Sequence, residues 1–538
     1  MLELTRKGIT DKAGFARAGI RVPEFDIDAV RKATAAAPVW VHLSAGNLFK
    51  AFHASLAQRI IEAGATDKGV IVAEPFDYEA VTKVFTPHDN LCLRVVMQAE
   101  GGLDKEVLAS VTEALAADSA GADWGRLLEI FASPSLQMVS LSITEKGYGL
   151  RAIDGAFRPD ILAQFDAGPD KPEHAMLKLC SLMLHRFKNG AAPVALVSTD
   201  NFSHNGDRLK EALSTAAAAW QERGFVGRDF LAYLADPAKV TFPLSMIDKI
   251  TPYPAERVKE ALAQAGLVNI DPVKTSKGAL ASPFVNTEET EYLVIEDLFP
   301  NGRPPLHLTG VHFTDRQTVD KVERMKVCTC LNPLHTALAV SGCLLGYDSI
   351  AAEMQNPALA GLVRKMAYTE GLPVVTDPGI IEPVAFLSTV LEKRLPNPNI
   401  PDTPQRIATD TSQKLGIRFG ETIKLYAADP ALGTARLRYI PLVIALWCRC
   451  LMALKDDGTA FEPSPDPLLA ELRPRVANVI LGKPETARDA LRPILSNEKI
   501  FGVNLYTVGL GERIEGYFGE LIAGPGAVKK TLEKYAAA

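Results

Sequence analysis

Short apolar runs and amphipathic segments alternate through the first 300 residues of the chain. The apolar runs are rich in Val, Ile and Leu and close on small or polar residues, a pattern that favours buried strands. Residues 47–63 have helical spacing and stop at Gly64, and residues 105–131 are predicted to be rich in helix. Such alternation predicts a Rossmann-like, doubly wound parallel sheet. The predicted strands cover residues 38–46, 69–74, 91–98, 138–143 and 194–198.

The apolar spacing becomes that of helices from about residue 310. A Pro/Gly-rich segment, FPNGRPP at 299–305, separates the strand-rich part of the chain from the helix-rich part and predicts a domain boundary near residue 300. We therefore expect an α/β fold with an N-terminal arm (1–37) that carries one short helix, a Rossmann-like domain (38–300) and a mostly α-helical domain (301–538), with a ligand cleft between the two domains. The helices are predicted over 318–348, 349–370, 383–394, 413–427, 439–454, 467–481, 485–495 and 506–522.

Composition narrows the class of protein. The chain has 538 residues, 47% of them hydrophobic, and a formal net charge of −6. A net negative charge does not attract the negatively charged phosphate backbone, so nucleic acid is not an expected partner. The first residues lack the apolar core of a signal peptide, and the most apolar stretch, 440–454, is short for a membrane span and contains Arg449. A cytoplasmic protein with no membrane partner is expected.

Seven cysteines are too few for a disulfide framework in a chain of this length. Cys328 and Cys330 form one C-x-C pair, and Cys448 and Cys450 form another. A structural zinc site would need further ligands at matching spacing nearby, and the sequence has none. We therefore expect buried thiols and no metal.

The turn Ser44-Ala45-Gly46 joins the first predicted strand to the first amphipathic helix. The start of such a helix presents backbone N–H groups and a positive dipole end to a pyrophosphate. Glu74 ends the next strand, where a carboxylate would accept ribose hydroxyls and repel the extra phosphate of NADP. The turn alone is equally consistent with an ordinary strand–helix connection, because Ser44 replaces the first glycine of the usual motif.

Three further segments place polar groups where chemistry is expected. Asp200 and Asn201 follow a strand and face the crevice of the sheet, although Asx turns have the same composition. Asp248 and Lys249 lie in an apolar run, which a buried charge pair would also explain. Lys326, Asn332 and His335 lie on one otherwise apolar helix, and burying three polar groups there without a purpose would be costly.

Five motifs in this order resemble the mannitol dehydrogenase family, the polyol-specific long-chain dehydrogenases. The resemblance spans residues 38–530, and segments 323–339 and 401–424 are most similar to members that act on D-mannonate. The motifs are Ser44-x-Gly46, Thr144–Tyr148, Asp200-Asn201 with Asn205-Gly206, Phe242-Pro243 with Met246–Asp248, and Lys326 with Asn332 and His335.

The resemblance implies an NAD-dependent, metal-independent exchange of a secondary alcohol and a ketone on a small sugar acid or polyol. It assigns Lys326 as the general base or acid, Asn201 and Asn332 as amides that hold the substrate oxygen, and His335 as an orienting residue. The substrate contacts that it implies are Asp248, Arg406 and Asn205. The cofactor contacts are Ser44, Gly46, Asn47, Glu74, Thr144 and Glu145.

Other substrates stay open, namely tagaturonate and mannitol, as do an epimerase that retains NAD and a catalytically inactive NAD-binding regulator. The chain also departs from the family pattern. Ser44 and Lys50 stand where the family usually has glycine and arginine, the segment between Asn205 and Asp248 is longer, and Lys326 and Asn332 are six positions apart instead of the usual five.

The extra residue predicts an irregular helix. In a regular α-helix six residues advance about 600°, so Lys326 would point roughly 120° away from Asn332. A π-bulge, or a break with Asn332 as N-cap and Pro333 as the first helical residue, would let the two side chains converge. We therefore predict irregular geometry between Lys326 and Pro333, with these side chains, His335 and Asn201 facing one cleft.

Overall fold

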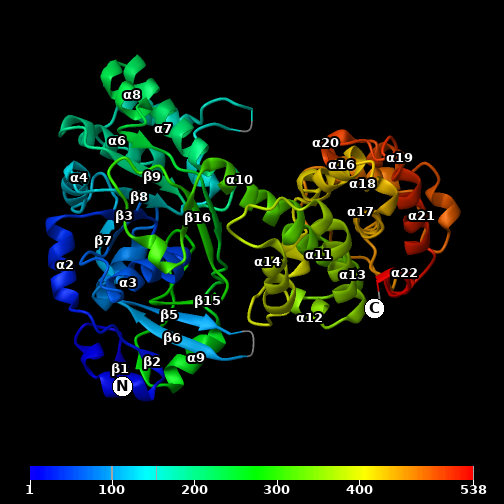
Figure 1. Cartoon of the computed structure of the whole chain (residues 1–538), viewed down its shortest axis with the longest axis horizontal. Helices are drawn as coiled ribbons and strands as arrows, with labels where there is room; N and C mark the ends of the chain where they lie inside the picture. Colours follow the sequence, from blue (N-terminus) through cyan, green and yellow to red (C-terminus); the bar gives the residue numbers. More distant parts are fainter. Residues whose placement is uncertain (99–100, 153, 537–538) are drawn as a thin grey trace. The chain divides into compact units, whose positions relative to one another are not determined.

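The structure, a computed structural model, describes residues 1–98, 101–152 and 154–536. The chain divides into two compact units, unit 1 (Met1–Val319) and unit 2 (Asp320–Ala538) (Figure 1). The boundary expected near residue 300 thus lies further along the chain. Strand β17 (His312–Thr314) pairs in parallel with β16 (Tyr292–Glu296), and this pairing keeps the residues after 300 in unit 1.

Unit 1 is built around a six-stranded sheet with the order β10-β9-β8-β3-β4-β7, in which every neighbouring pair is parallel. The strand order reverses between β3 and β8. In open parallel sheets, ligands bind outside the carboxyl ends of the strands at such a reversal. The strands are β3 (Trp40–Leu43), β4 (Val70–Glu74), β7 (Val111–Ala116), β8 (Met138–Leu141), β9 (Val194–Ser198) and β10 (Val240–Thr241).

Alternate residues of this sheet enter two different hydrophobic clusters. Val41 and Ile71 belong to one cluster, whereas Trp40 and Val70 belong to the other. The sheet is therefore covered on both faces, which confirms the doubly wound architecture. The helices of unit 1 are α1 (Lys12–Arg17), α2 (Ile27–Ala36), α3 (Ala54–Glu62), α4 (Trp124–Ala132), α5 (Pro159–Ala167), α6 (Ala175–Lys188), α7 (Asn205–Glu222), α8 (Arg228–Ala235) and α9 (Glu256–Gln264).

Residues 1–37 are part of unit 1 and not the surface arm that the sequence suggested. Phe15 and Ile20 are buried in a third hydrophobic cluster. Strand β2 (Ile20–Arg21) pairs with β6 (Leu103–Leu108), and β1 (Leu2–Glu3) pairs with β12 (Leu267–Val268). The segment is therefore anchored to unit 1 by buried apolar side chains and by pairing with distant strands.

The helix-rich stretch expected over 105–131 is wrong in its first half. Residues 103–116 form two strands, β6 and β7, and only α4 follows. β6 is antiparallel to β5 (Cys92–Met97), where Arg94 lies opposite Glu106 and their side chains are 2.8 Å apart. This long-range pairing overrides the local spacing.

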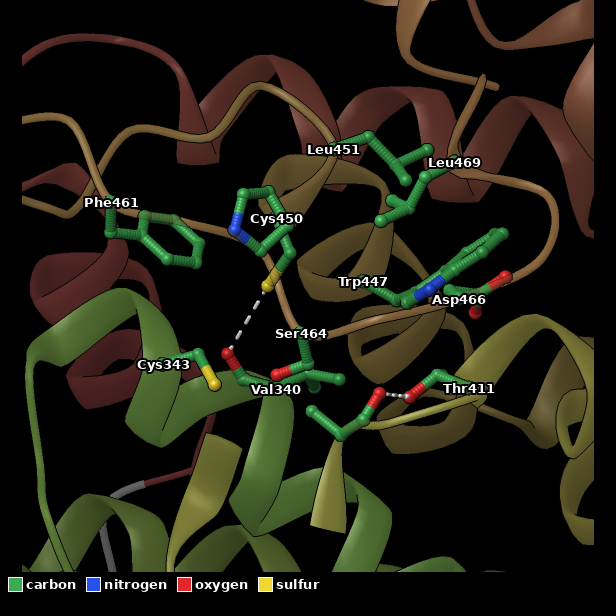
Figure 2. Close-up of a pocket in the computed structure, with 12 residues that line it drawn as sticks. Val340, Cys343, Thr411, Trp447, Cys450, Leu451, Phe461, Ser464, Asp466 and Leu469 are labelled. Carbon is green, nitrogen blue, oxygen red and sulfur yellow. Dashed lines mark hydrogen bonds between the residues drawn. The ribbon is translucent and has the colours of Figure 1, made fainter. Parts of the chain in front are cut away.

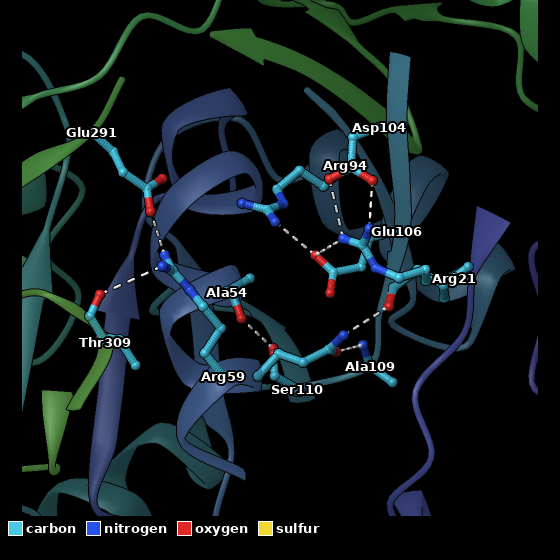
Figure 3. Close-up of polar contacts among 12 residues, drawn as sticks. Arg21, Ala54, Arg59, Arg94, Asp104, Glu106, Ala109, Ser110, Glu291 and Thr309 are labelled. Atoms are coloured by element: carbon cyan, nitrogen blue, oxygen red, sulfur yellow. Dashed lines mark hydrogen bonds and ion pairs between the residues drawn. The ribbon is translucent and has the colours of Figure 1, made fainter. Parts of the chain in front are cut away.

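Unit 1 also contains smaller sheets, and polar contacts join α3 to chain segments beside their strands (Figure 3). Arg59 on α3 donates to Glu291 at 2.7 Å, and Ser110 donates to the carbonyl of Ala54 at 2.6 Å. The remaining strands are β11 (Ser245–Asp248), β13 (Val273–Lys274), β14 (Leu280–Ala281) and β15 (Phe284–Glu288).

Unit 2 is helical, as predicted, although residues 485–495 hold only a short α-helix. The expected buried helix over 439–454 is α17, whose Arg449 is fully buried. After α10 (Arg316–Arg324), its helices are α11 (Asn332–Leu345), α12 (Ile350–Met354), α13 (Pro357–Met366), α14 (Pro383–Thr389), α15 (Pro404–Ile407), α16 (Glu421–Ala428), α17 (Tyr439–Cys450), α18 (Leu469–Val476), α19 (Arg492–Leu495), α20 (Glu498–Phe501), α21 (Gly511–Leu521) and α22 (Ala527–Ala536).

Six π-helical segments interrupt or precede α-helices in the described part of the chain. They are η2 (Phe49–His53), η3 (Val81–Phe85), η7 (Met325–Cys330), η8 (Ala367–Gly371), η10 (Val390–Arg394) and η12 (Gly416–Gly420). One continuous helical run, Arg316–Leu345, is long and apolar enough to cross a membrane, but 83% of its apolar window is buried within the protein.

Six of the seven cysteines are buried, as expected, and Cys450 is partly buried. All seven are free thiols, and burial raises the pKa of Cys328 and of Cys330 to about 11. Cys343 and Cys450 line a cavity of about 40 Å³ in unit 2, where Cys450 Sγ lies 3.4 Å from the carbonyl oxygen of Val340 (Figure 2). Thiols with raised pKa values are weak metal ligands.

Candidate active site

The turn after β3 has an unusual backbone conformation. Ser44 has a φ of 107°, a conformation that favours glycine. The helical run that follows covers residues 47–62 and begins beside β4 and β8, at the reversal of the strand order. Gly46 leaves room for a close approach, because an added Cβ would contact only Ser44 Oγ, at 3.4 Å.

Glu74 supports this turn and does not present a free carboxylate. Its side chain is buried and accepts the backbone N–H of Ala45 at 2.7 Å, of Phe76 at 2.9 Å and of Asp77 at 3.0 Å. Burial raises its pKa, and the three N–H donors oppose that rise. We therefore assign Glu74 to shaping the turn, and its contact with the ribose stays a prediction.

Two other residues near the turn are also engaged. Lys50, in η2, is buried and donates to the carbonyl of Ser282 at 2.7 Å, and burial lowers its pKa to about 8. Asn47 donates to the carbonyl of Pro252 at 3.4 Å. Both side chains thus connect the first helix of the sheet to the smaller strands of unit 1.

The loop after β8 is shaped by Asp200. Its carboxylate accepts the backbone N–H of Ile143 and of Thr144 and the hydroxyl of Tyr148, at 2.7 to 3.0 Å. Thr144 adopts a positive φ of 67° in this loop, and the exposed Glu145 lines a pocket of about 310 Å³. Asp200 therefore positions the predicted cofactor contacts Thr144 and Glu145, a role that its Asp-Asn pattern did not reveal.

Asn201 and Asn205 have different environments. Asn201 is exposed at the end of β9. Asn205 is buried, donates to the carbonyls of Asp200 and Ser245 at 3.0 Å, and accepts the N–H of Ser245 at 3.1 Å. Because its amide is used within the protein, we assign Asn205 to positioning the loop after β9 and not to substrate binding.

Asp248 is the last residue of β11, and Lys249 follows it directly. Asp248 is buried, and Lys249 donates to the carbonyl of Glu288 at 2.6 Å and lies 3.1 Å from Glu291. Lys249 therefore belongs to a buried charge pair, the structural explanation considered for this segment, while Asp248 remains a predicted substrate contact.

The helix that carries Lys326 is irregular, as the spacing predicted. Lys326 is buried within η7, and the N–H of Leu331 donates to the carbonyl of Lys326 at 3.1 Å, a π-type bond. Leu331 leaves helical geometry with φ −132° and ψ −62°, and α11 starts at Asn332 with Pro333 in its first turn. Both predicted devices, the π-bulge and the break, occur together, with Leu331 and not Asn332 as the N-cap.

His335 lies one turn into α11. Its Nε2 is 3.2 Å from Asp402 Oδ2, and burial lowers the pKa of His335. Asp402 also accepts a hydrogen bond from Arg406, and although its burial opposes ionisation, His335 and Arg406 hold its pKa below the usual range. Arg406, an expected substrate contact, is largely exposed, and its guanidinium is already paired with the Asp402 carboxylate.

Two cations of unit 2 that follow Arg406 along the chain were not assigned from the sequence. Arg418 donates to Thr336 Oγ1 at 2.5 Å, and Lys414 donates to the carbonyl of Thr409 at 2.5 Å. Both lie in the segment 401–424 that carried part of the family resemblance, which was the available signal. Among the described residues, no group of three or more His, Cys, Asp or Glu side chains could hold a metal ion.

Comparison with known proteins gives the family. Residues 39–307 match the mannitol dehydrogenase Rossmann domain, and residues 318–513 match the mannitol dehydrogenase C-terminal domain. A D-mannonate oxidoreductase of Thermotoga maritima is 50% identical over 535 residues, which cover 99% of each chain. A mannitol 2-dehydrogenase of Cereibacter sphaeroides is 30% identical over 81% of this chain and 86% of its own.

A solved structure has the same fold. The mannitol 2-dehydrogenase of Pseudomonas fluorescens, in a ternary complex with NAD and D-mannitol, superposes with a TM-score of 0.70 at 23% identity and 99% coverage of both chains. The parallel sheet, the loop after β3 and the lysine-bearing helix of unit 2 thus occur in a chain whose two halves match one family of enzymes. The chain belongs to the mannitol dehydrogenase family and is an oxidoreductase of the dehydrogenase type.

Proposed function

We propose that the enzyme interconverts D-mannonate and D-fructuronate, with NAD as the hydride carrier. The observation that carries this proposal is the junction of η7 and α11, where the buried Lys326 is followed by Asn332 in the first turn of a new helix. The choice of substrate is supported by the 50% identity to a D-mannonate oxidoreductase over nearly the whole chain.

In this mechanism Lys326 takes the proton of the substrate hydroxyl during oxidation and returns it during reduction. Asn201 and Asn332 donate N–H groups to the substrate oxygen as its negative charge grows, each contribution being about 3 kcal/mol. His335, neutral and held beside Asp402, orients the sugar. A bound NAD would supply the hydride-transfer chemistry, and the residues of the loops after β3 and β8 would hold it.

The described residues fit a dinucleotide. The loop with Ser44 in a glycine-like conformation, the helix start behind it and the strand reversal beside it are the features that receive a pyrophosphate. Ser44, Gly46 and Asn47 would lie along the phosphates, with Thr144 and Glu145 toward the nicotinamide end. Glu74 keeps a carboxylate behind this loop, so we propose a preference for NAD over NADP, which the ratio of kcat/KM for NADH and NADPH tests.

The catalytic assignment is tested by Lys326→Ala. Loss of the proton-transfer group should lower kcat by at least about 100-fold. The matched control is Lys529→Ala on α22, a lysine with 66% of its side chain exposed, which should retain full activity. Near-normal turnover of Lys326→Ala would overturn the assignment.

The substrate is tested by oxidation of NADH with D-fructuronate, D-tagaturonate and D-fructose. We expect the highest kcat/KM for fructuronate. A maximum with tagaturonate or fructose would instead favour a tagaturonate reductase or a mannitol 2-dehydrogenase. Sugar-acid isomerisation without net oxidation of added NADH would favour an epimerase that retains its cofactor.

Lysine and amides supply the acid, base and oxyanion contacts of this mechanism, so no step needs a metal. Treatment with EDTA should leave the activity unchanged. Inactivation by EDTA that added zinc reverses would contradict the mechanism.

A further inference from the structure

Arg418 in η12 is a partly buried cation without a carboxylate partner among the described residues. It donates one hydrogen bond, from Nη1 to Thr336 Oγ1 at 2.5 Å. Burial lowers its pKa to about 10, so the guanidinium stays protonated at neutral pH. A guanidinium has five N–H donors, and one neutral hydroxyl satisfies only a small part of that capacity.

The side chain meets the face of α11 that carries the proposed catalytic amide. Thr336 is four residues after Asn332, so the two lie on one face of the helix. The Thr336 hydroxyl donates to the carbonyl of Asn332 at 3.0 Å while it accepts from Arg418. Arg418 is thereby connected through a single side chain to the residue proposed to hold the reacting oxygen.

The backbone around Arg418 is anchored to the lysine-bearing segment as well. Thr422, four residues later, donates to the carbonyl of Cys328 in η7 at 3.3 Å. Gly420 packs so closely that an added Cβ would lie 1.9 Å from the carbonyl oxygen of Phe501. The position of Arg418 relative to η7 and α11 is therefore fixed from two sides.

The electrostatic surroundings are positive. The charge of Arg418 contributes to lowering the pKa of His335 and the pKa of Lys414, so both groups lie within its field. Asp402 already accepts from Arg406 and lies beside His335, and two further carboxylates, Asp410 and Asp466, raise the pKa of Lys414. Four cations stand against these three carboxylates, namely Arg394, Arg406, Lys414 and Arg418. A partly desolvated cation with spare donors in a positive field favours an anionic ligand.

We propose that Arg418 binds the carboxylate of a sugar-acid substrate and determines the preference for sugar acids over uncharged polyols. This inference rests on the proposed function and names the residue that recognises the acid end. The guanidinium would present two parallel N–H groups to the carboxylate, a bidentate geometry that a lysine cannot reproduce. Arg406 is a weaker candidate because its side chain is 62% exposed and paired with Asp402.

The test compares two substrates that differ in the carboxylate. Arg418→Gln should lower kcat/KM for D-fructuronate by about 100-fold, as expected for loss of one partner of a desolvated charge pair, and should change kcat/KM for D-fructose by less than about threefold. Arg418→Lys should recover part of the fructuronate activity, because it restores the charge without the fork. Arg364→Gln, an exposed arginine on α13, is the matched control and should change neither value.

Equal losses on both substrates would show that Arg418 acts only through the fold, and an unchanged preference would show that the carboxylate binds elsewhere; either result overturns the proposal. Binding of D-mannonate measured by calorimetry provides a readout independent of turnover, with an expected increase in Kd of at least about tenfold for Arg418→Gln. If the unmodified enzyme prefers D-tagaturonate, the proposed substrate fails, but the same comparison with tagaturonate still tests Arg418. If the enzyme prefers D-fructose, both fail.

Discussion

Ser44 places an L-amino acid with a side chain in a backbone conformation that glycine adopts freely. Its φ of 107° lies in the left-handed half of the map, where a Cβ atom is crowded. The strain must be compensated by contacts around the turn, among them the bond from the Ser44 N–H to the carbonyl of Ala73 at 2.9 Å. Strain of this kind typically costs 1 to 3 kcal/mol, at order-of-magnitude precision.

Ser44→Gly should therefore stabilise unit 1 by about 1 kcal/mol, after the greater freedom of glycine in the unfolded chain is subtracted. The free energy of unfolding in urea measures this gain. Ser44→Ala keeps the Cβ atom and should show none. A loss of stability in Ser44→Gly would mean that the serine hydroxyl, and not its backbone, determines the turn.

Glu353 is a second residue with a measurable energetic cost. It is fully buried on α12, and its two carboxyl oxygens lack hydrogen-bond partners among the described residues. Burial raises its pKa from 4.5 to about 9, so the folded chain holds a proton there that the unfolded chain releases. Its neighbour is Gly342, where an added Cβ would lie 2.2 Å from the Glu353 carboxyl.

The sign of the effect follows from proton binding. Between pH 4.5 and about 9 the folded state binds the extra proton, so the stability of unit 2 falls as the pH rises, by up to about 1.4 kcal/mol per pH unit. Glu353→Gln should remove this slope and unfold at higher urea than the unmodified chain at about pH 8. Glu370→Gln is the contrasting variant: Glu370 accepts the N–H groups at the start of α17, and its loss should destabilise at every pH.

At the scale of elements, Gly206 shows why a motif glycine stands at the start of α7. A Cβ at this position would lie 2.5 Å from the carbonyl oxygen of Phe242 and 2.6 Å from that of Pro243, both of them backbone atoms. The helix therefore packs directly against the segment before β11. The two motifs Asn205-Gly206 and Phe242-Pro243, read separately in the sequence, form one contact.

Gly206→Ala should lower the free energy of unfolding by at least about 2 kcal/mol, because neither backbone segment can move freely. Gly516→Ala on α21 is the control, since nothing lies within 4 Å of its added Cβ and alanine favours helices. That variant should gain up to about 1 kcal/mol. Similar changes in the two variants, measured in urea, would contradict the proposed packing.

Strands were predictable where local composition determines them. The largely apolar runs of β3, β4, β8 and β9 appear in the expected places, and the six-residue spacing of Lys326 and Asn332 predicted the irregular helix. β6 was missed because its pairing partner β5 lies in another predicted element, and tertiary pairing determined the outcome. Bonds such as Arg418 to Thr336, 82 residues apart, leave no local pattern in the sequence.

At the scale of the whole molecule, the buried histidines of unit 1 and Glu353 of unit 2 should respond to pH in opposite directions. Unit 1 contains His42 and His53, buried with ring centroids 4.2 Å apart, and burial lowers the pKa of both, that of His53 to about 4. His174 accepts the N–H of Met176 at the start of α6 and has a pKa lowered to about 4 by burial. Unit 2 contains Glu353, whose pKa is raised.

The folded unit 1 keeps His53 and His174 neutral down to about pH 4, whereas the unfolded chain protonates them below pH 6.5. The stability of unit 1 therefore falls as the pH drops from 6.5 to about 4. Unit 2 gains stability over the same fall through Glu353. We expect limited proteolysis in urea to cleave unit 1 first at about pH 5 and unit 2 to become more susceptible at about pH 8. His53→Phe should reduce the acid sensitivity of unit 1, and parallel responses of the two units would contradict this division.

The π-helical segments have a consequence for the history of the chain. Each π-turn holds one residue more between its hydrogen-bonded partners than an α-turn does. A helix that gains one residue, through insertion of a single codon, can therefore form a π-turn there and leave the side chains before and after it on their original faces. The six segments would then be six places where the gene changed length without a change of fold. Single-residue gaps in the genes of relatives should gather at these sites, and η7, between the lysine and the asparagine, should be among them.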